Sequence, residues 1–364
     1  MKKILLIFGT RPEAIKMCPL VPELKKRKSL KAVVCVTGQH REMLDGVLSA
    51  FGVTPDYDLS LMKEGQTLFD ITAGVLSGIE AVLEKEKPDT VLVHGDTTTA
   101  FAAALGCFYK QIPVGHVEAG LRTYDVKSPF PEEFNRRAIT LMASIHFAPT
   151  PLSKENLLQE GVDPKTVFVT GNTAIDALKA TVREDYTHPA LEWAKGSRLI
   201  MLTAHRRESL GEPMRAMFRA IRRVLEEHPD VKVIYPIHKN PAVRALAKAE
   251  LCGFDRIRIT EPLEVLDFHN FLARSYLILT DSGGVQEEAP SLGKPVLVMR
   301  DTTERPEGIK AGTLKLAGTR EEGIYQSFQH LLRDKSTYTA MAKAPNPYGD
   351  GNACKRIADI LAGE

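Results

Sequence analysis

The sequence has few of the features that mark secreted, membrane or metal-binding proteins. Its 364 residues include five widely spaced cysteines and no C-x-x-C pair, so neither a disulfide framework nor a zinc site is predicted. No stretch approaches the ~18 apolar residues of a membrane-spanning helix. The apolar stretch 4–8 is too short for a secretion signal, and no cleavage site follows it. We therefore expect a cytoplasmic protein with reduced, buried thiols and no metal.

An excess of charge of one sign is also lacking. The chain carries 48 basic and 46 acidic residues, which are interspersed and give a formal net charge of +2. This balance provides no broad basic surface for nucleic acid or for an anionic membrane, so neither is expected as a partner. Any recognition of negative charge should be local.

Two nucleotide-binding fingerprints are missing as well. No G-x-G-x-x-G follows a predicted strand, and no G-x-x-x-x-G-K-[ST] occurs. A dinucleotide-binding turn and a P-loop are therefore excluded, and no cofactor is expected. An anion site in this chain must be of another kind.

What the sequence does contain is a regular alternation of short apolar runs with longer amphipathic segments. This pattern is typical of βα units around parallel sheets, and 364 residues exceed what one core usually serves. We therefore predict an α/β protein with two doubly wound, Rossmann-like lobes. The expected strands are 3–8, 32–37, 90–94, 114–117, 145–148 and 167–169, then 198–202, 232–235, 256–260, 276–279, 296–299 and 313–316.

A polar, weakly periodic segment, 183–197, lies between the two halves. Such a segment is typical of a connection between domains, and the boundary is placed just before it or within it. We assign residues 1–170 to the first lobe and 171–345 to the second.

Charged side chains follow three of the strands predicted in the first half. Arg11 and Lys16 belong to GTRPEAIK, directly after the first strand. Asp96, in HGDTTTA, and Glu118, in HVEAGLRT, each follow a later strand. Ligands of open α/β sheets bind beyond the carboxyl ends of the strands. These side chains are therefore candidates for one site.

A third carboxylate, Glu132, belongs to SPFPEEFNRR. Pro131 suits the first position of a helix, so Glu132 is expected to face Arg136 one turn later. Structural interpretations exist as well: a helix N-terminus favours an acid such as Glu132, and Asp96 suits a helix cap. A functional role is favoured because independent structural roles would scatter these groups rather than gather them at strand ends.

The second half provides basic and anion-binding groups at its strand ends. His205 and Arg206 belong to TAHRRES, and His238 belongs to YPIHKNP. Either histidine taken alone is more often a structural residue. The segment 276–301 has the pattern of a strand, a turn, a helix and a second strand, with DSGG at the turn.

The glycines of this turn, Gly283 and Gly284, allow backbone N–H groups at a helix N-terminus to approach a phosphate. Glu288 lies about one helical turn further on, where a carboxylate can accept hydrogen bonds from two vicinal hydroxyls. A nucleoside diphosphate has both features, so the segment predicts a nucleotide site. For the neighbouring Glu287, the structural alternative is a solvated residue of the helix surface.

Several long motifs, in this order, resemble those of the non-hydrolysing UDP-N-acetylglucosamine 2-epimerases. They cover nearly the whole chain and read FGTRPEAIK, TGQHREMLD, VHGDTTTA, GHVEAGLRT, TGNTAIDAL, TAHRRES, LTDSGGVQEEAPSLGKPVLVMRDTTERPE and NPYGDGNA. The resemblance implies the glycosyltransferase-B architecture, with a C-terminal helix (346–364) that crosses back onto the first lobe. It also implies a homodimer that converts UDP-GlcNAc reversibly to UDP-ManNAc, usually for bacterial surface polysaccharides.

The resemblance also implies roles for individual residues. The carboxylates that handle protons are Asp96, Glu118 and Glu132, with Arg136 beside them and His205 near the diphosphate. The substrate-binding residues are Arg11, Lys16, Phe268, Ser282, Gly283, Gly284 and Glu288. Some relatives are activated by a second UDP-GlcNAc, which contacts counterparts of Gln39, Arg206 and His238. Glu42 stands where activated relatives carry Gln, and this departs from the pattern of the activated enzymes.

The chemistry follows from the substrate. C2 of the sugar has no adjacent carbonyl, so a carboxylate with a pKa near 4 cannot remove its hydrogen directly. If the bond between UDP and the anomeric carbon breaks first or at the same time, the C2 hydrogen becomes acidic and its loss gives a 2-acetamidoglucal. UDP then adds back with protonation on the other face. Three crowded carboxylates cannot all stay charged, so at least one should have a raised pKa.

Three alternatives remain at this point. A glycosyltransferase of the same architecture would share the nucleotide site, but it would not need acids on three separate elements. A hydrolysing epimerase would release free ManNAc. A sugar-nucleotide sensor without activity would keep the DSGG turn and Glu288 but could lose the acids of the first lobe.

Overall fold

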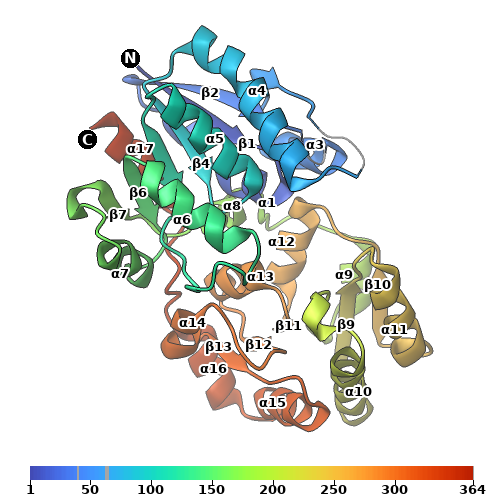
Figure 1. Cartoon of the computed structure of the whole chain (residues 1–364). Coiled ribbons are helices and arrows are strands. Elements are labelled where there is room, and N and C mark those ends of the chain that lie inside the picture. Colours follow the sequence, from blue (N-terminus) through green and yellow to red (C-terminus); the bar gives the residue numbers. More distant parts are fainter. Residues whose placement is uncertain (39–40, 62–64, 364) are drawn as a thin grey trace. The chain divides into compact units, whose positions relative to one another are not determined.

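The computed structural model describes residues 1–38, 41–61 and 65–363, without the side chains of 41–43 and 207. The chain divides into two compact units (Figure 1): Met1–Ala180 with Tyr348–Glu364, and Thr181–Pro347. The division lies ten residues after the predicted boundary at 170. The reason is that helix α8 (Thr173–Thr181) is tied to the C-terminal helix, since Asp176 of α8 accepts hydrogen bonds from the N–H groups of Ala353 (3.2 Å) and Cys354 (2.9 Å).

The first unit contains a seven-stranded parallel sheet in the order β3-β2-β1-β4-β5-β6-β7. Its strands are β1 Lys2–Phe8, β2 Leu30–Val36, β3 Tyr57–Asp58, β4 Thr90–His94, β5 Val114–Val117, β6 Ile145–Ala148 and β7 Val167–Val169. Its helices are α1 Arg11–Met17, α2 Leu20–Lys25, α3 Arg41–Ala50, α4 Leu68–Glu86, α5 Thr98–Tyr109, α6 Glu132–Met142, α7 Pro151–Gln159, α8 Thr173–Thr181 and α17 Ala353–Ala362, with a 3-10 turn η1 at Pro164–Thr166.

The second unit contains a six-stranded parallel sheet in the order β10-β9-β8-β11-β12-β13. Its strands are β8 Arg198–Thr203, β9 Val231–Pro236, β10 Ile257–Thr260, β11 Leu277–Thr280, β12 Val296–Val298 and β13 Leu314–Leu316. Its helices are α9 Pro189–Ala194, α10 Glu212–Glu227, α11 Pro241–Leu251, α12 Val265–Arg274, α13 Gly283–Glu288, α14 Pro306–Ala311, α15 Glu321–Arg333 and α16 Lys335–Lys343, with 3-10 turns η2 at Arg207–Ser209 and η3 at Ala289–Leu292.

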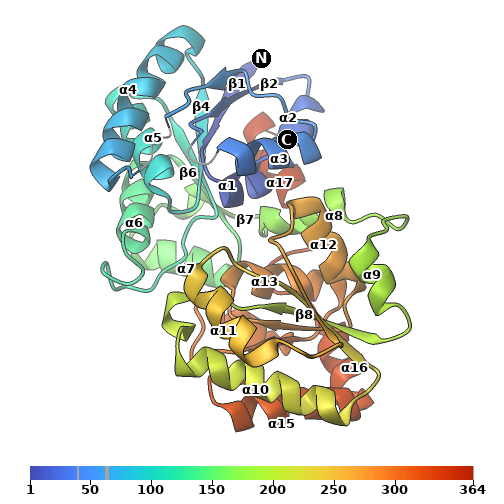
Figure 2. The same ribbon diagram turned by 90° about the vertical axis from the view of Figure 1, so that its right-hand side faces the viewer.

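Apolar side chains on both faces of each sheet explain the layers. In β8, Ile200 and Leu202 pack with α10, α11 and α15, whereas Leu199 and Met201 pack with α9, α12 and α13. This alternation follows from the two-residue period of a strand, and it places helices on both faces. In the first unit, α4, α5 and α6 cover one face of the sheet, and α1, α2 and α17 lie on the other (Figure 2).

The strand order reverses between β1 and β4 in the first sheet and between β8 and β11 in the second. Connections leave in opposite directions at such a point, and ligands of open α/β sheets bind beyond the carboxyl ends of the two central strands there. Apart from Phe268, which follows β10, the predicted site residues that the structure describes follow strands at or next to this reversal.

The predicted doubly wound α/β class is confirmed, and so are the twelve predicted strands, within two residues at each end. β3 was not predicted, because Tyr57–Asp58 is too short to form an apolar run. Four cysteines are buried as expected, but Cys252 is exposed, so the prediction of buried thiols is wrong there. Among the described residues, no helix is long and apolar enough to cross a membrane, and no cluster of His, Cys, Asp and Glu could hold a metal ion.

Candidate functional site

The turn after β1 begins the site of the first unit. Thr10 caps α1 and forms a capping box with Glu13, whose carboxylate accepts hydrogen bonds from the N–H groups of Gly9 (3.1 Å) and Thr10 (2.8 Å). The same buried carboxylate accepts a hydrogen bond from the hydroxyl of Thr97 (2.7 Å), and burial raises the pKa of Glu13. The turn that carries Arg11 is thus joined to the turn after β4, which carries Asp96.

Glu118 is the central carboxylate of this unit. It follows β5 in the left-handed region, with φ at +64°, which few residues other than glycine adopt. The ammonium of Lys16 pairs with Oε1, and the side-chain amide of Asn172 donates to the same oxygen (3.2 Å). His94 Nε2 lies 3.8 Å from Oε2. Burial lowers the pKa of His94 to about 4, so His94 is uncharged at neutral pH.

Asp96 forms a second acidic position beside Arg136. Its Oδ2 accepts a hydrogen bond from Arg136 Nη2 (2.5 Å), and its backbone carbonyl accepts one from Asn135 (2.9 Å). The side chain of Asp96 is 27% exposed, but burial of its carboxyl group raises the pKa of Asp96. The charge of Arg136 opposes this rise in pKa, and the charge of Glu118 adds to it. The direction agrees with the expectation that at least one carboxylate has a raised pKa.

The predicted pairing of Glu132 with Arg136 is wrong. Arg136 pairs with Asp96 and, through Nη1, with Glu133 (3.2 Å). Glu133 is fully buried and also accepts the N–H groups of residues 123 and 124 (3.0 Å each), so it fixes the loop before α6. Glu132, the first residue of α6, is half-buried and makes no side-chain hydrogen bond or ion pair within the described parts of the chain.

In the second unit, Asp281 joins the ends of β8 and β11. Its fully buried carboxylate accepts the N–H groups of His205 (2.8 Å) and Arg206 (2.9 Å). The ring of His205 stacks on that of His238, with centroids 5.5 Å apart. Burial lowers the pKa of His205, although the charge of Asp281 opposes this effect. The structure therefore places His205 and Arg206 on Asp281, which the sequence analysis did not select, and His238 on the ring of His205.

The two glycines of the DSGG turn have different surroundings. A Cβ on Gly283 would lie 3.0 Å from Glu304 Oε1, so a side chain there would displace that carboxylate. A Cβ on Gly284 would meet nothing closer than Glu288 Oε1, at 4.0 Å. The space beside Gly283 is thus limited by the Glu304 carboxylate, whereas the space beside Gly284 is open.

Glu304 organises three arginines next to this turn. Its carboxylate pairs with Arg206 (3.0 Å), Arg300 (2.7 Å) and Arg305 (3.6 Å). Burial opposes its ionisation, but the charges and hydrogen bonds of these neighbours, Arg305 first, lower the pKa of Glu304 to about 2. The cluster was missed by the sequence analysis, although Arg300, Glu304 and Arg305 lie in the quoted motif VMRDTTERPE and Arg206 lies in TAHRRES.

The adjacent glutamates of α13 also differ. Only 2% of the side chain of Glu287 is exposed, and Oε1 pairs with Arg305 Nε (2.5 Å), so its interpretation as a solvated residue is wrong. Glu288 Oε2 lies 4.0 Å from Nε2 of His269, whose Nδ1 is 2.6 Å from the hydroxyl of Thr181.

Phe268, next to His269 in α12, packs against the apolar core of this unit. Gln39 lies outside the described residues.

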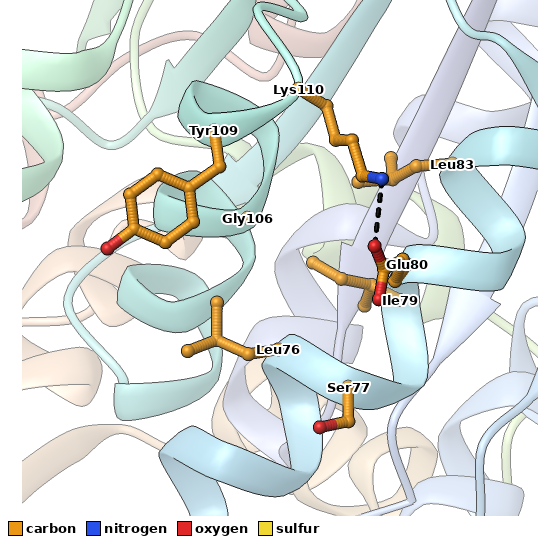
Figure 3. Close-up of a pocket in the computed structure, with 8 residues that line it drawn as sticks. All are labelled: Leu76, Ser77, Ile79, Glu80, Leu83, Gly106, Tyr109 and Lys110. Atoms are coloured by element: carbon orange, nitrogen blue, oxygen red, sulfur yellow. Dashed lines mark ion pairs between the residues drawn. The ribbon is translucent and has the colours of Figure 1, made fainter.

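A pocket elsewhere in the first unit lies between α4 and α5 (Figure 3). It has a volume of about 230 Å³, and Lys110 forms an ion pair with Glu80 (2.8 Å) at its side. None of its residues is among the predicted site residues. Its lining residues are Leu76, Ser77, Ile79, Glu80, Leu83, Gly106, Tyr109 and Lys110.

Comparison with known proteins identifies the family. A family model described as UDP-N-acetylglucosamine 2-epimerase matches residues 22–362. The UDP-N-acetylglucosamine 2-epimerase of Bacillus subtilis is 60% identical over 359 residues, which cover 99% of this chain and 94% of that protein.

Solved structures agree with this match. The crystal structure of a putative UDP-N-acetylglucosamine 2-epimerase from Listeria monocytogenes is similar with a TM-score of 0.94 and 58% identity, and the match covers 99% of this chain and 96% of that one. The UDP-GlcNAc 2-epimerase from Neisseria meningitidis, solved bound to UDP-GlcNAc, has a TM-score of 0.91 and 48% identity over 100% of both chains. The glycotransferase of kitacinnamycin is similar with a TM-score of 0.67 and 11% identity, over 99% of this chain and 98% of that one. At this identity the likeness shows the fold alone, and it supports the predicted glycosyltransferase-B type. The chain belongs to the UDP-N-acetylglucosamine 2-epimerase family.

Proposed function

We propose that the protein is a non-hydrolysing UDP-N-acetylglucosamine 2-epimerase, which interconverts UDP-GlcNAc and UDP-ManNAc. The observation that carries the proposal is the arrangement, in a member of this family, of two carboxylates at neighbouring strand ends, each with its own cation. Asp96 faces Arg136, and Glu118 faces Lys16. Such paired groups suit acid and base catalysis more than they suit binding of an anionic nucleotide.

The reaction proceeds by elimination and re-addition of UDP. Departure of UDP makes the C2 hydrogen acidic, a carboxylate removes it, and the 2-acetamidoglucal is then protonated on the opposite face. Asp96, Glu118 and Glu132 handle these protons, with Arg136 beside Asp96. The raised pKa of Asp96 favours its protonated form, as required of an acid that gives up a proton.

The second unit holds the nucleotide. Ser282, Gly283 and Gly284 bind the pyrophosphate, and Glu288 accepts hydrogen bonds from the ribose hydroxyls. The space beside Gly284 is open, and Glu288 Oε1 lies 4.0 Å from the position that a Cβ on Gly284 would take, which supports this assignment. The remaining binding residues are Phe268 and Arg11 near the uracil and nucleotide, His205 near the diphosphate, and Lys16.

We propose that a second UDP-GlcNAc activates the enzyme and that it contacts Arg206, His238 and Gln39. The stacking of His238 on His205, the neighbour of Arg206, supports a link between this position and the nucleotide site. A structure of the UDP-GlcNAc 2-epimerase from Methanocaldococcus jannaschii contains both UDP-GlcNAc and UDP. Calorimetry with UDP-GlcNAc in the presence of saturating UDP tests for a second binding event.

We also propose that the protein is a cytoplasmic homodimer and that it supplies UDP-ManNAc for surface polysaccharides. The dimer is supported by large apolar side chains exposed on α4 and α6, among them Phe69 (87% exposed), Phe134 (50%) and Leu141 (87%). In the first unit these helices cover the same face of the sheet (Figure 2). Replacing Phe69 and Leu141 by Ser should shift the mass measured by light scattering toward the monomer.

Product analysis tests the function itself. Purified protein is incubated with UDP-GlcNAc and EDTA, without added NAD, and followed by proton NMR. UDP-ManNAc should form until equilibrium is reached. Release of free ManNAc would identify a hydrolysing epimerase, a requirement for an acceptor would identify a glycosyltransferase, and binding without conversion would identify a sensor.

A further inference from the structure

Asn172 lies in the loop between β7 and α8 and has only 3% of its surface exposed. Its Oδ1 accepts a hydrogen bond from the N–H of Ala174 (2.9 Å), and its Nδ2 donates to Glu118 Oε1 (3.2 Å). Because an amide oxygen accepts and an amide nitrogen donates, the contact with Ala174 fixes which end of the side chain faces Glu118. The short side chain of Asn172 is therefore a buried donor with a fixed orientation toward Glu118.

The backbone of Asn172 is held by the C-terminal segment of the chain. Its N–H donates to the carbonyl of Tyr348 (2.7 Å). A Cβ on Gly349, which has φ at +134°, would lie 3.2 Å from the Cα of Gly171 and 3.3 Å from the nitrogen of Asn172. The two backbones thus approach as closely as glycine permits.

An ion pair fixes the C-terminal segment to the same loop. Arg356 binds Asp350 through both Nη atoms (2.8 and 2.7 Å), and its Nη1 also donates to the carbonyl of Thr170 (3.0 Å). Residues 170–174 and 348–356 therefore form one hydrogen-bonded assembly. A displacement of the C-terminal segment would move Asn172 with it.

We propose that Asn172 is a positioning residue for Glu118 and that the C-terminal segment Tyr348–Gly351 sets its position. The inference rests on the role in proton transfer that is proposed above for Glu118. Lys16, which also contacts Oε1, is a point charge on a flexible four-carbon chain and fixes no direction. Proton transfer depends on placement within a few tenths of an ångström, so a directional donor is the group that aims the carboxylate.

A double-mutant cycle tests the inference. Asn172→Ala should lower kcat about tenfold or more and change KM for UDP-GlcNAc and the Kd for UDP less than about threefold. In the Glu118→Gln background, Asn172→Ala should cause no further loss of kcat, because it acts only through the carboxylate. An equal loss in both backgrounds would mean that Asn172 has a general structural role, and would overturn the proposal.

The cycle also separates two kinds of failure. If Glu118→Gln is impaired while Asn172→Ala turns over normally, the inference is wrong and the proposed function stands. If Glu118→Gln itself turns over normally, the role proposed for Glu118 is wrong and the inference falls with it. Circular dichroism and the thermal midpoint verify that each variant is folded.

Variants of the C-terminal segment provide a second measurement that does not depend on replacing Asn172. Gly349→Ala should lower kcat at least about threefold, whereas Gly161→Ala, also at a positive φ but with nothing within 4 Å, should leave kcat within twofold. If Gly349→Ala does not fold, Arg356→Lys replaces it. Its control is Arg219→Lys, which alters a surface ion pair in the second unit. Equal kcat values for a test variant and its control would overturn the role of the segment.

Discussion

Each candidate site includes a pair of adjacent glutamates, Glu132 and Glu133 in the first unit and Glu287 and Glu288 in the second. In both pairs one carboxylate is buried and used within its own unit: Glu133 binds Arg136 and two backbone N–H groups, and Glu287 binds Arg305. The other member, Glu132 or Glu288, keeps part of its surface exposed beside a proposed ligand position.

The two pairs differ in which member is structural. The second glutamate is buried in the first unit, and the first is buried in the second. Successive residues of a helix point about 100° apart, so two neighbouring side chains face different surroundings. The direction of the core, and not the residue type, therefore decides which glutamate is left for a ligand.

The largest expected effect is on turnover in the first unit. Glu132→Gln should lower kcat by ~10² or more and leave UDP affinity within a few-fold, because the amide keeps the size of the side chain but cannot take a proton. Asp96→Asn and Glu118→Gln should behave in the same way. Steady-state kinetics and calorimetry measure both quantities. Near-normal kcat in all three variants would leave these acids with structural roles only.

The buried members should affect stability instead. Glu287→Ala leaves Arg305 without its shortest ion pair and should lower the free energy of unfolding by about 2–3 kcal/mol. Glu288→Ala should change it by less than about 0.5 kcal/mol. Urea denaturation of the two variants measures the difference. Equal stabilities would remove the distinction between the two glutamates.

Glu288 should be needed for UDP. Glu288→Ala should weaken binding by on the order of 1.5–3 kcal/mol, because the ribose hydroxyls lose a charged acceptor. Glu226→Ala, on the exposed surface of α10, is the control and should bind UDP normally. Calorimetric titration decides the matter, and an unchanged Kd for Glu288→Ala would show that the ribose is bound elsewhere.

The smallest expected effect is a difference in pH dependence between Glu304 and Asp96. The pKa of Glu304 is lowered from 4.5 to about 2, so its stabilising contribution, about 1–2 kcal/mol after solvent screening, is present above pH 4.5 and is lost toward pH 2. The pKa of Asp96 is raised, so its ionisation reduces stability as pH rises above 3.8.

The two substitutions should therefore change the pH profile with opposite signs. The stability of the wild type relative to Glu304→Gln should fall as pH is lowered from 5 to 3. The stability of the wild type relative to Asp96→Asn should fall as pH is raised from 4 to 7. Urea midpoints measured across this range provide the comparison, and slopes of the same sign would contradict the assigned environments.

The sequence was sufficient for the strands and for the strand ends because both depend on local patterns. An apolar run identifies a buried parallel strand, and a charged residue directly after it lies at the carboxyl edge of the sheet. Tyr57–Asp58 was missed because two residues at a sheet edge form no such run.

The partners of the site residues could not be predicted in the same way. Lys16 and Glu118 are 102 positions apart, and Asn172 and Glu118 are 54 apart. Their contacts depend on how loops after different strands converge, and hydrophobic periodicity carries no information on this. The motif TGNTAIDAL was noticed as a whole, but only the buried amide contact singles out Asn172.

The central claim is that a carboxylate of the first unit removes the hydrogen at C2 after UDP departs. Proton NMR of UDP-GlcNAc incubated with the enzyme in deuterium oxide tests this claim most directly. We predict that UDP-ManNAc forms with deuterium at C2 and at no other sugar carbon, and that the remaining UDP-GlcNAc also acquires deuterium there. Conversion that retains the original hydrogen at C2 would contradict the account.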